Sequence, residues 1–593
     1  SETRIHEMSD LNQRRAIIKF YNPGADAVSL IVEGYRDPWP MNKDKNGQWS
    51  TRLHLPFRDL NGRAYHFEVT HNGSTTAISD PLAQRTKRID HHLRSFFSEL
   101  SYSWKQCHYR TPAFQDIIIY ETHMPALSRH SSAQVEHQSH RGTYVGARAL
   151  EILRHLQKLN VAVEFLPLHA SDELLGADWG YFSTSFNAMR ENYALDENQT
   201  NHEVMELIDA LHCQGLPVLL DVVYNHGGEL LVKAWGKDIV YRKFDNGDFC
   251  EGSGCGPTIH TENPMIRETI IQSLEQLVKI YRFDGFRFDL GALHDKYTLR
   301  EIDRRLPSHI YLIAEPWALG GTKWGKGDLH GDLADTRWAV WNDDFREPAK
   351  TFVMGHGDQH NRGRLMAAIK GCNVHDGGWS LRPQQCINYL SSHDGKTLAD
   401  FCHGDKKRVF LSIMLVLISQ GIPMIAEGSE MMYSKHDEHN SYNRPDLNQL
   451  DWGQLQQHND LVDSVAQMIK LRKKYPHFRY TGQLTEFSNN SHRWDIDWIY
   501  PTGYPHEDNL NAIGVLLRPP RRRWFPWLRS RNLLLILLNG SDIGADFHLP
   551  KGKWRVMVDG NSLDVNLHGI SNVEPAKSSY FSHPGTGVIL ALM

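Results

Sequence analysis

The pattern of apolar and polar positions changes twice along the chain. Residues 1–112 hold short β-rich segments separated by turn sequences such as Asn-Pro-Gly at 22–24. Residues 113–478 alternate short apolar segments with longer amphipathic ones, and residues 479–593 return to short apolar segments. This pattern predicts an α/β protein in which a (β/α)8 TIM barrel is flanked by an N-terminal and a C-terminal β-sandwich domain.

Eight apolar segments in the central region predict the barrel strands, and several of them end in polar residues. They are residues 115–124, 161–169, 217–227, 285–292, 310–317, 337–345, 385–395 and 421–430. Helices are predicted between and after them, among them 146–160, 202–215, 262–281 and 460–479. Asn263 and Pro264 are typical of an N-cap and a first helical turn, and Gly215 is typical of a helix end.

Two consecutive predicted strands end in carboxylates, Asp289 in GFRFDLGA and Glu315 in IYLIAEPW. A carboxylate at the end of a buried strand is costly unless it is paired or used in function. The ends of parallel barrel strands meet at one face, so these acids are expected to lie close together there. Two ion-paired structural acids would also fit. Asp394 and the polar residues that end other strands favour an active site.

Seven sequence blocks resemble the conserved regions of the α-amylase superfamily, glycoside hydrolase family 13. The blocks are DVVYNHG, GSGCGP, DGFRFDLGA, IAEPW, WNDDFRE, INYLSSHDGKTL and NSYNRPDLNQLDW. The chain is more closely similar to the isoamylase-type glycogen debranching enzymes of bacteria. The resemblance extends over nearly the whole chain and includes residues 1–112, which are similar to a starch-binding module.

The resemblance implies catalytic roles for Asp289, Glu315 and Asp394. Asp289 would be the nucleophile, Glu315 the general acid and base, and Asp394 a stabiliser of the transition state. Such a retaining pair is expected about 5–5.5 Å apart, with the pKa of Glu315 raised. Arg287, two residues before Asp289 and so on the same strand face, would keep Asp289 ionised.

The resemblance also implies binding and supporting residues around the three acids, although a lone His or Trp of this kind is often purely structural. The predicted substrate-binding residues are Arg287, His226, His393, Tyr181, Trp179 and Lys396, and the predicted supporting residues are Asp221 and Asn225. Two positions depart from relatives, which carry an aromatic residue in place of Lys396 and often Asp in place of Ala318. Both positions are expected to border the cleft, so these departures affect which leaving group the enzyme would prefer.

Composition limits which partners and which cellular compartment are expected for this protein. The 593 residues carry a formal charge of −5, so nucleic acid is not an expected partner. The seven Cys lack zinc-finger spacing, and we expect free thiols in a cytoplasmic protein with no secretory signal, no membrane segment and a monomeric state. No cofactor or metal is expected. Asn225 matches a calcium ligand of some relatives but does not make a site alone. The basic, aromatic segment 519–531 predicts an exposed loop or a contact site.

These features predict a hydrolase that cleaves α-1,6 branch linkages of glycogen or limit dextrin. Four alternatives share part of the pattern. They are an α-1,4-acting amylase or maltooligosyl-trehalose hydrolase, a branching enzyme, a pullulanase-like enzyme, and an inactive glucan-binding scaffold. The joint presence of Asp289, Glu315 and Asp394 disfavours the scaffold.

Overall fold

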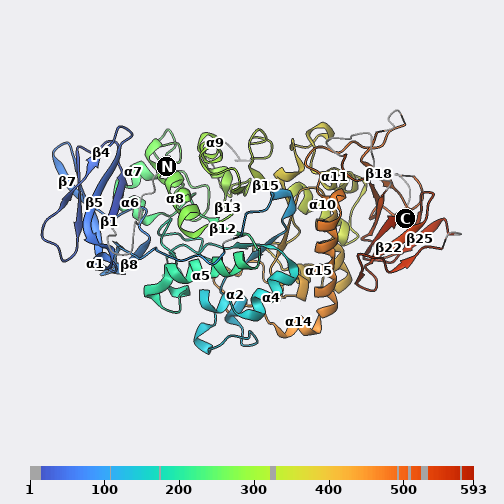
Figure 1. Ribbon diagram of the computed structural model, residues 1–593. Coiled ribbons are helices and arrows are strands. Elements are labelled where there is room, and N and C mark those ends of the chain that lie inside the picture. The colour runs from blue at the N-terminus through green and yellow to red at the C-terminus, as the bar shows by residue number, and fades with distance from the viewer. Residues whose placement is uncertain are drawn as a thin grey trace.

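A closed parallel barrel lies between two β-rich regions in the computed structural model (Figure 1). The structure describes residues 15–593 apart from 107, 173, 174, 176, 321–328, 490–492, 505–508, 522–531, 575 and 576. The predicted fold class is confirmed, and each of the eight predicted segments contains one barrel strand in the predicted order. The strands are β10 Ile119–Thr122, β11 Ala162–Phe165, β12 Val218–Val222, β13 Gly285–Phe288, β14 Tyr311–Ala314, β15 Ala339–Trp341, β16 Cys386–Asn388 and β17 Ile422–Ala426.

The inside of the barrel is built in two layers by the alternation of side chains along each strand. Ile119, Ala162 and Leu219 belong to an apolar cluster that fills the lower part of the barrel. The residue two positions later on the same strands points the same way but is acidic: Glu121, Glu164 and Asp221. Position 285 has room only for glycine, because a Cβ there would lie 2.6 Å from the Cβ of Tyr311 on the next strand. The apolar layer therefore supports a polar layer at the carboxyl ends of the strands.

Helices cover the outside of the barrel. The longer ones are α4 Leu150–Leu159, α5 Thr200–Cys213, α8 Pro264–Tyr281, α9 Lys296–Arg305, α10 Asp343–Val353, α11 Gln359–Ile369, α13 Lys406–Ile418 and α15 Asn459–Lys474. The short ones include α2 Ala126–Arg129, α3 Tyr144–Ala147, α6 Glu229–Trp235, α7 Lys237–Val240, α12 Leu398–Phe401 and α14 Gly453–Gln457. Asn263 caps α8 as predicted, because its side chain accepts a hydrogen bond from the Met265 amide. The predicted helix 146–160 is instead broken into α3 and α4, because Ala149 is extended (ψ 144°).

The N-terminal region forms two sheets around a separate hydrophobic core. One holds β1 Arg15–Tyr21, β5 Gln48–Pro56 and β4 Asn42–Lys43, and the other holds β3 Trp39–Pro40, β2 Ala27–Val32, β6 Ala64–His71, β9 His92–Phe96, β8 Arg85–Ile89 and β7 Ser74–Ile78. A short helix, α1 Phe57–Leu60, follows β5. Ala234 and Trp235, from the barrel helix α6, pack into this core, and the Trp235 ring stacks on Phe20 with centroids 6.5 Å apart. The barrel thus completes the core of this region.

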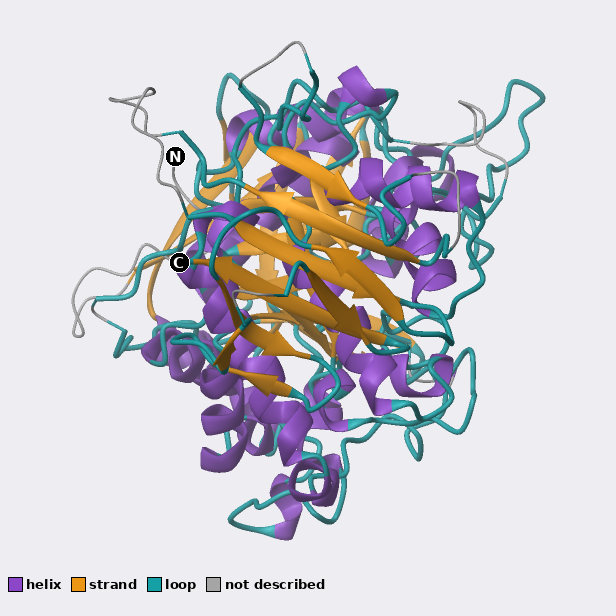
Figure 2. Cartoon of the chain, turned by 90° about the vertical axis from the view of Figure 1, so that its right-hand side faces the viewer, coloured by secondary structure: helices purple, strands orange, loops and turns teal. Residues whose placement is uncertain are grey.

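The C-terminal region, whose side of the molecule faces the viewer in Figure 2, places a larger sheet between the barrel helices and a small second sheet. The larger sheet holds β18 Ile496–Ile499, β19 Ala512–Leu517, β20 Leu534–Asn539, β26 Thr586–Leu592, β22 Trp554–Asp559, β23 Asp564–Val565 and β24 Ser571–Asn572, and the smaller holds β21 Ala545–His548 and β25 Ser579–Ser582. Ile536 and Ile589 join the main core shared with α13, whereas Leu537 and Leu590 face the outer cluster. Most of the predicted contact segment 519–531 lies outside the described residues.

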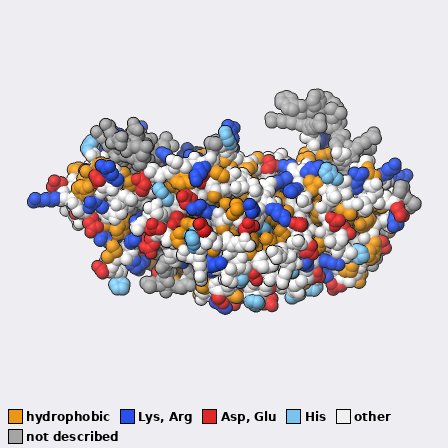
Figure 3. All heavy atoms as spheres, turned by 60° about the horizontal axis from the view of Figure 1, so that its bottom comes forward, with side chains coloured by type: hydrophobic (Ala, Val, Ile, Leu, Met, Phe, Trp, Pro, Cys, Tyr) orange, Lys and Arg blue, Asp and Glu red, His pale blue; other side chains and the backbone are white. Residues whose placement is uncertain are grey.

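The surface of the molecule mixes charges of both signs. On the face drawn in Figure 3, Lys and Arg side chains are interspersed with Asp and Glu. No helix among the described residues has the length and apolar composition that a membrane crossing requires. The apolar run 413–418 instead forms part of α13, where every residue from Arg408 to Ile418 is buried.

Candidate active site

A cleft of about 720 Å³ lies at the carboxyl ends of the barrel strands. Eight of the predicted site residues line it: Trp179, Tyr181, His226, Asp289, Glu315, His393, Asp394 and Lys396. The other three, Arg287, Asp221 and Asn225, are buried and contact the lining residues from behind. The structure therefore brings the whole predicted set to one end of the barrel.

The Arg287 side chain is the centre of the charged groups and is fully buried. Its Nη1 donates to Asp221 at 2.9 Å and to Asp289 Oδ1 at 3.0 Å, and its Nη2 lies 3.0 Å from Glu315 Oε2. The guanidinium also lies 4.2 Å from the centre of the Trp341 ring. One cation therefore faces three carboxylates, and a fixed guanidinium of this kind holds them in a defined arrangement.

The carboxylate of Asp289 is oriented by a neighbouring amide. Asn225 Nδ2 donates to Asp289 Oδ2 at 2.8 Å and to the Asp289 carbonyl at 2.9 Å. The next residue, Leu290, adopts the left-handed conformation (φ 42°), which is strained for a residue with a side chain. This turn directs the Leu290 amide onto Glu315 Oε2 at 2.7 Å. The strained turn thus joins the ends of β13 and β14.

Glu315 is only 4% exposed. Burial raises its pKa to about 7, because loss of solvent and the negative charge of Asp289 together outweigh the attraction of Arg287. A carboxyl group with such a pKa holds a proton in neutral or mildly acidic solution. It is therefore suited to donate that proton to a leaving group and to take one from water afterwards.

Two histidines and a tyrosine form one wall of the cleft. The Tyr181 hydroxyl donates to Asp221 Oδ2 at 2.6 Å, and its ring stacks on His393 with centroids 5.1 Å apart. His226 has Nδ1 2.6 Å from Asn225 Oδ1 and Nε2 2.7 Å from the Tyr181 carbonyl, so a sugar hydroxyl would share or replace one of these contacts. Burial opposes the charge on His393, but Asp394 and Glu121 raise the pKa of its ring to about 9.

The remaining predicted residues stand at the rim or in the wall. The Asp394 side chain is 61% exposed, with Oδ2 3.4 Å from His393 Nε2, so its carboxylate is open to a ligand. Lys396 Nζ donates to Asp437 Oδ1 at 2.6 Å, an ion pair across the rim. Trp179 is 4% exposed and meets the His393 ring edge-on, which makes it part of the wall rather than an open stacking platform.

A buried lysine that sequence reasoning missed joins two of the motifs. Lys435 is 6% exposed, and its Nζ donates to Ser441 Oγ at 3.0 Å and lies 5.6 Å from the centre of the Trp179 ring. Asn448 Nδ2 donates to Oδ2 of Asp178, the residue directly before Trp179, at 3.0 Å. Ser441 and Asn448 belong to the block NSYNRPDLNQLDW, so this block is fixed against residues 177–182, the segment that carries Trp179 and Tyr181.

Two acids inside the barrel were also missed. Glu121 accepts from the His393 amide at 2.7 Å and lies 2.6 Å from His393 Nδ1. Glu164 is 1% exposed, and neither carboxylate oxygen has a hydrogen-bond partner among the described residues. Burial and the charges of Glu121 and Asp221 raise the pKa of Glu164 well above its usual value. The available signal was a single charge within each apolar run, IIIYET and VAVEF.

Replacing Glu164 by Gln should make the fold less sensitive to alkaline pH. A carboxyl whose pKa is raised above its usual 4.5 stabilises the fold at low pH, and that contribution is lost as pH rises through the raised value. Gln has no proton to lose, so at pH 9 the variant should melt about 2 °C or more above the parent. Calorimetry between pH 5 and 9 measures this, and parallel melting curves would show that Glu164 is not held neutral.

Potential metal ligands lie apart from the catalytic acids. The side chain of Asn225 contacts Asp289 and His226, so it is already engaged within the site. In the part of the chain that the structure describes, one group of three or more His, Cys, Asp or Glu residues has its ligand atoms within 4.8 Å of one another. It consists of His330, Asp343 and Asp344, and none of these lines the cleft.

Solved structures share this architecture. A pullulanase from Bacillus acidopullulyticus superposes with a TM-score of 0.83 at 24% identity, covering 100% of this chain and 75% of that chain. A pullulanase from Paenibacillus barengoltzii has a TM-score of 0.80 at 24% identity, covering 99% of this chain and 95% of that chain. At this identity the likeness concerns the fold, which is the same from the N-terminal sheets to the C-terminal ones.

Curated proteins are also similar to this chain in amino-acid sequence. No family model matches the chain. The glycogen debranching enzyme of Dickeya chrysanthemi is 28% identical over 530 residues, covering 78% of this chain and 76% of its own length. Isoamylase 3 of Oryza sativa subsp. japonica, a chloroplastic protein, is 28% identical over 534 residues, covering 76% of this chain and 65% of its own length. Fold and site resemble those of the barrel glycosidases of the α-amylase superfamily, glycoside hydrolase family 13. Within that superfamily, the chain is similar to enzymes named glycogen debranching enzyme and isoamylase.

Proposed function

We propose that the chain is a retaining glycoside hydrolase that cleaves α-1,6 branch linkages of glycogen or limit dextrin by double displacement. The observation that carries this proposal is the pair of carboxylates on adjacent strand ends, Asp289 and Glu315, each 3.0 Å from the buried guanidinium of Arg287. Retaining glycosidases use such a pair, one as nucleophile and one as acid and base.

The reaction follows from the protonation states of the two acids. Glu315 gives its proton to the glycosidic oxygen while Asp289 attacks the anomeric carbon, so the carbon–oxygen bond breaks and a glycosyl ester of Asp289 forms. Glu315, now ionised, takes a proton from water, which attacks the same carbon and releases Asp289. Asp394, exposed in the cleft, would bind hydroxyls of the distorted sugar, and Tyr181 would face its ring. Two inversions leave the α-configuration unchanged.

The choice of α-1,6 linkages and branched glucan rests on the relatives. Their names include glycogen debranching enzyme and isoamylase, and a mutant of the Paenibacillus barengoltzii pullulanase has been solved with maltotetraose. The chemistry at the anomeric carbon is the same for α-1,4 and α-1,6 bonds, so the selecting residues must contact the leaving chain. We infer that Lys396 with Asp437, and the segment 440–452 that Lys435 contacts through Ser441, meet the leaving chain. Cytoplasmic location and a monomeric state remain predictions.

Digestion of glycogen, branched limit dextrin and linear maltoheptaose tests the linkage. We expect linear oligomers and stronger iodine staining from the branched substrates, because outer chains are released intact. Maltoheptaose should be cut at least tenfold more slowly. Rapid cutting of maltoheptaose with falling iodine colour would indicate an amylase, transfer without new reducing ends would indicate a branching enzyme, and preference for pullulan would indicate a pullulanase-like enzyme.

A further inference from the structure

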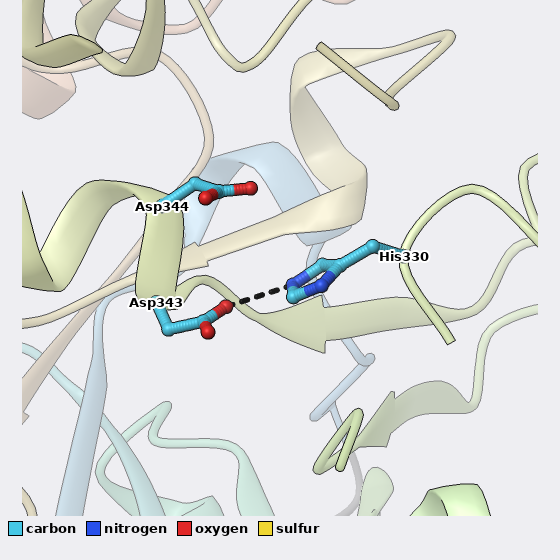
Figure 4. A group of neighbouring side chains, drawn as sticks. All are labelled: His330, Asp343 and Asp344. Atoms are coloured by element: carbon cyan, nitrogen blue, oxygen red, sulfur yellow. Dashed lines mark ion pairs between the residues drawn. The ribbon is translucent and has the colours of Figure 1, made fainter. Parts of the chain in front are cut away.

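Three side chains converge from two segments of the barrel (Figure 4). His330 lies in the connection from β14 to β15, and Asp343 and Asp344 are the first two residues of α10. His330 Nε2 lies 3.0 Å from Asp343 Oδ1, and ligand atoms of all three residues lie within 4.8 Å of one another. The figure shows the imidazole directed toward the two carboxylates.

We propose that His330, Asp343 and Asp344 together bind one divalent transition-metal ion. An imidazole nitrogen with two carboxylates is a ligand set that suits Zn²⁺ or Mn²⁺, whereas Mg²⁺ and Ca²⁺ prefer oxygen ligands alone. Nitrogen and oxygen ligands bind Zn²⁺ at about 2.0–2.2 Å, so a neighbouring pair around one ion stands roughly 3 Å apart. The separation of His330 Nε2 and Asp343 Oδ1 is 3.0 Å. The ligand atom of Asp344 lies within 4.8 Å of the other two, so rotation of its side chain would complete the group.

The surroundings hold the proposed ligands in place. Trp379 Nε1 donates to Asp344 Oδ2 at 3.1 Å, which leaves Oδ1 for an ion, and the Trp379 ring packs 4.8 Å from that of His330. Such outer hydrogen bonds orient ligands in metal sites. Arg364 Nη2, 3.7 Å from Asp344 Oδ1, is half-exposed and can turn toward solvent.

An ion here would connect two segments that border the cleft. The β14–β15 connection follows Glu315 and Trp317, and α10 carries Arg346, whose guanidinium lies 5.3 Å from the centre of the Trp317 ring. Fixing the start of α10 to His330 would therefore limit the motion of Arg346 and Trp317. The site has no part in bond cleavage, so its occupancy should be measured by binding and stability.

Titration calorimetry on the EDTA-dialysed full chain tests the site, with Zn²⁺ and Mn²⁺ as probes and Mg²⁺ for comparison. We expect one Zn²⁺ per chain, at least tenfold tighter than Mg²⁺, and a higher melting temperature with Zn²⁺. His330→Ala, Asp343→Asn and Asp344→Asn should each weaken Zn²⁺ binding at least tenfold and remove the thermal shift. The conservative Asn variants keep side-chain volume at the start of α10, so they guard against a simple loss of folding.

The matched control is His137→Ala with His140→Ala, since these histidines stand 5.1 Å apart between ring centroids and His137 is 67% exposed. That variant should bind Zn²⁺ as the parent does. Loss of binding in the control with full binding in His330→Ala would place the ion on the surface pair and overturn the proposal. So would the absence of any Zn²⁺ binding below millimolar concentration.

Discussion

Replacing Asp289 by Asn should reduce kcat by roughly 10⁴- to 10⁶-fold, the range seen when a catalytic nucleophile is removed. Asn has nearly the same shape but cannot form the glycosyl ester, so the first displacement fails. Binding of glucan should survive, because Asp394, Tyr181 and the rest of the cleft remain. Steady-state kinetics on limit dextrin and calorimetry with maltotetraose measure the two effects separately.

A control variant separates the loss of the nucleophile from the loss of any acid. Asp37→Asn changes an exposed residue of the N-terminal region and should retain the parental rate. NMR of the parent reaction should show the α-anomer first. An initial β-anomer, or substantial activity in Asp289→Asn, would rule out Asp289 as the nucleophile.

The activity should fall as pH rises through about 7, because Glu315 must be protonated to act as the acid and its pKa is about 7. The sign follows from burial, which favours the neutral form and so keeps the proton to higher pH than in a free carboxyl. Glu315→Gln should lose this alkaline limb together with roughly 10²- to 10⁴-fold of the rate on glucan. A maltosyl fluoride substrate, whose leaving group needs no proton, should still give a burst of fluoride.

Glu427 is the matched control for that pH profile. Burial raises the pKa of Glu427 to about 7 as well, but its Oε2 accepts from Thr122 and it lies outside the cleft lining. Glu427→Gln should therefore keep the alkaline limb of the kcat/KM profile. If Glu315→Gln retained the limb and Glu427→Gln lost it, the acid assignment would be wrong.

The barrel strands were predictable because each lies in a short, mostly apolar segment between longer amphipathic ones. The residues at their ends were predictable because parallel strands bring those ends together, as Asp289, Glu315 and His226 illustrate. Glu121 and Glu164 were missed because each lies within a run dominated by its apolar neighbours. Partners distant in sequence could not be predicted. Lys396 with Asp437 is one such pair, and the meeting of His330 with Asp343 is another. The break between α3 and α4 was also not predicted, because the extended Ala149 lies within a sequence pattern typical of one helix.

The packing of α6 into the N-terminal core bears on the order in which the chain folds during synthesis. The last strand of those sheets, β9, ends at Phe96, but the core also needs Ala234 and Trp235. At a synthesis rate of about 5–20 residues per second, these two residues leave the ribosome roughly 7 to 28 s after Phe96. During that interval the apolar face around Phe20 in the nascent N-terminal sheets is not covered by α6. A chaperone that binds exposed apolar surface is therefore expected to bind the nascent chain in this interval.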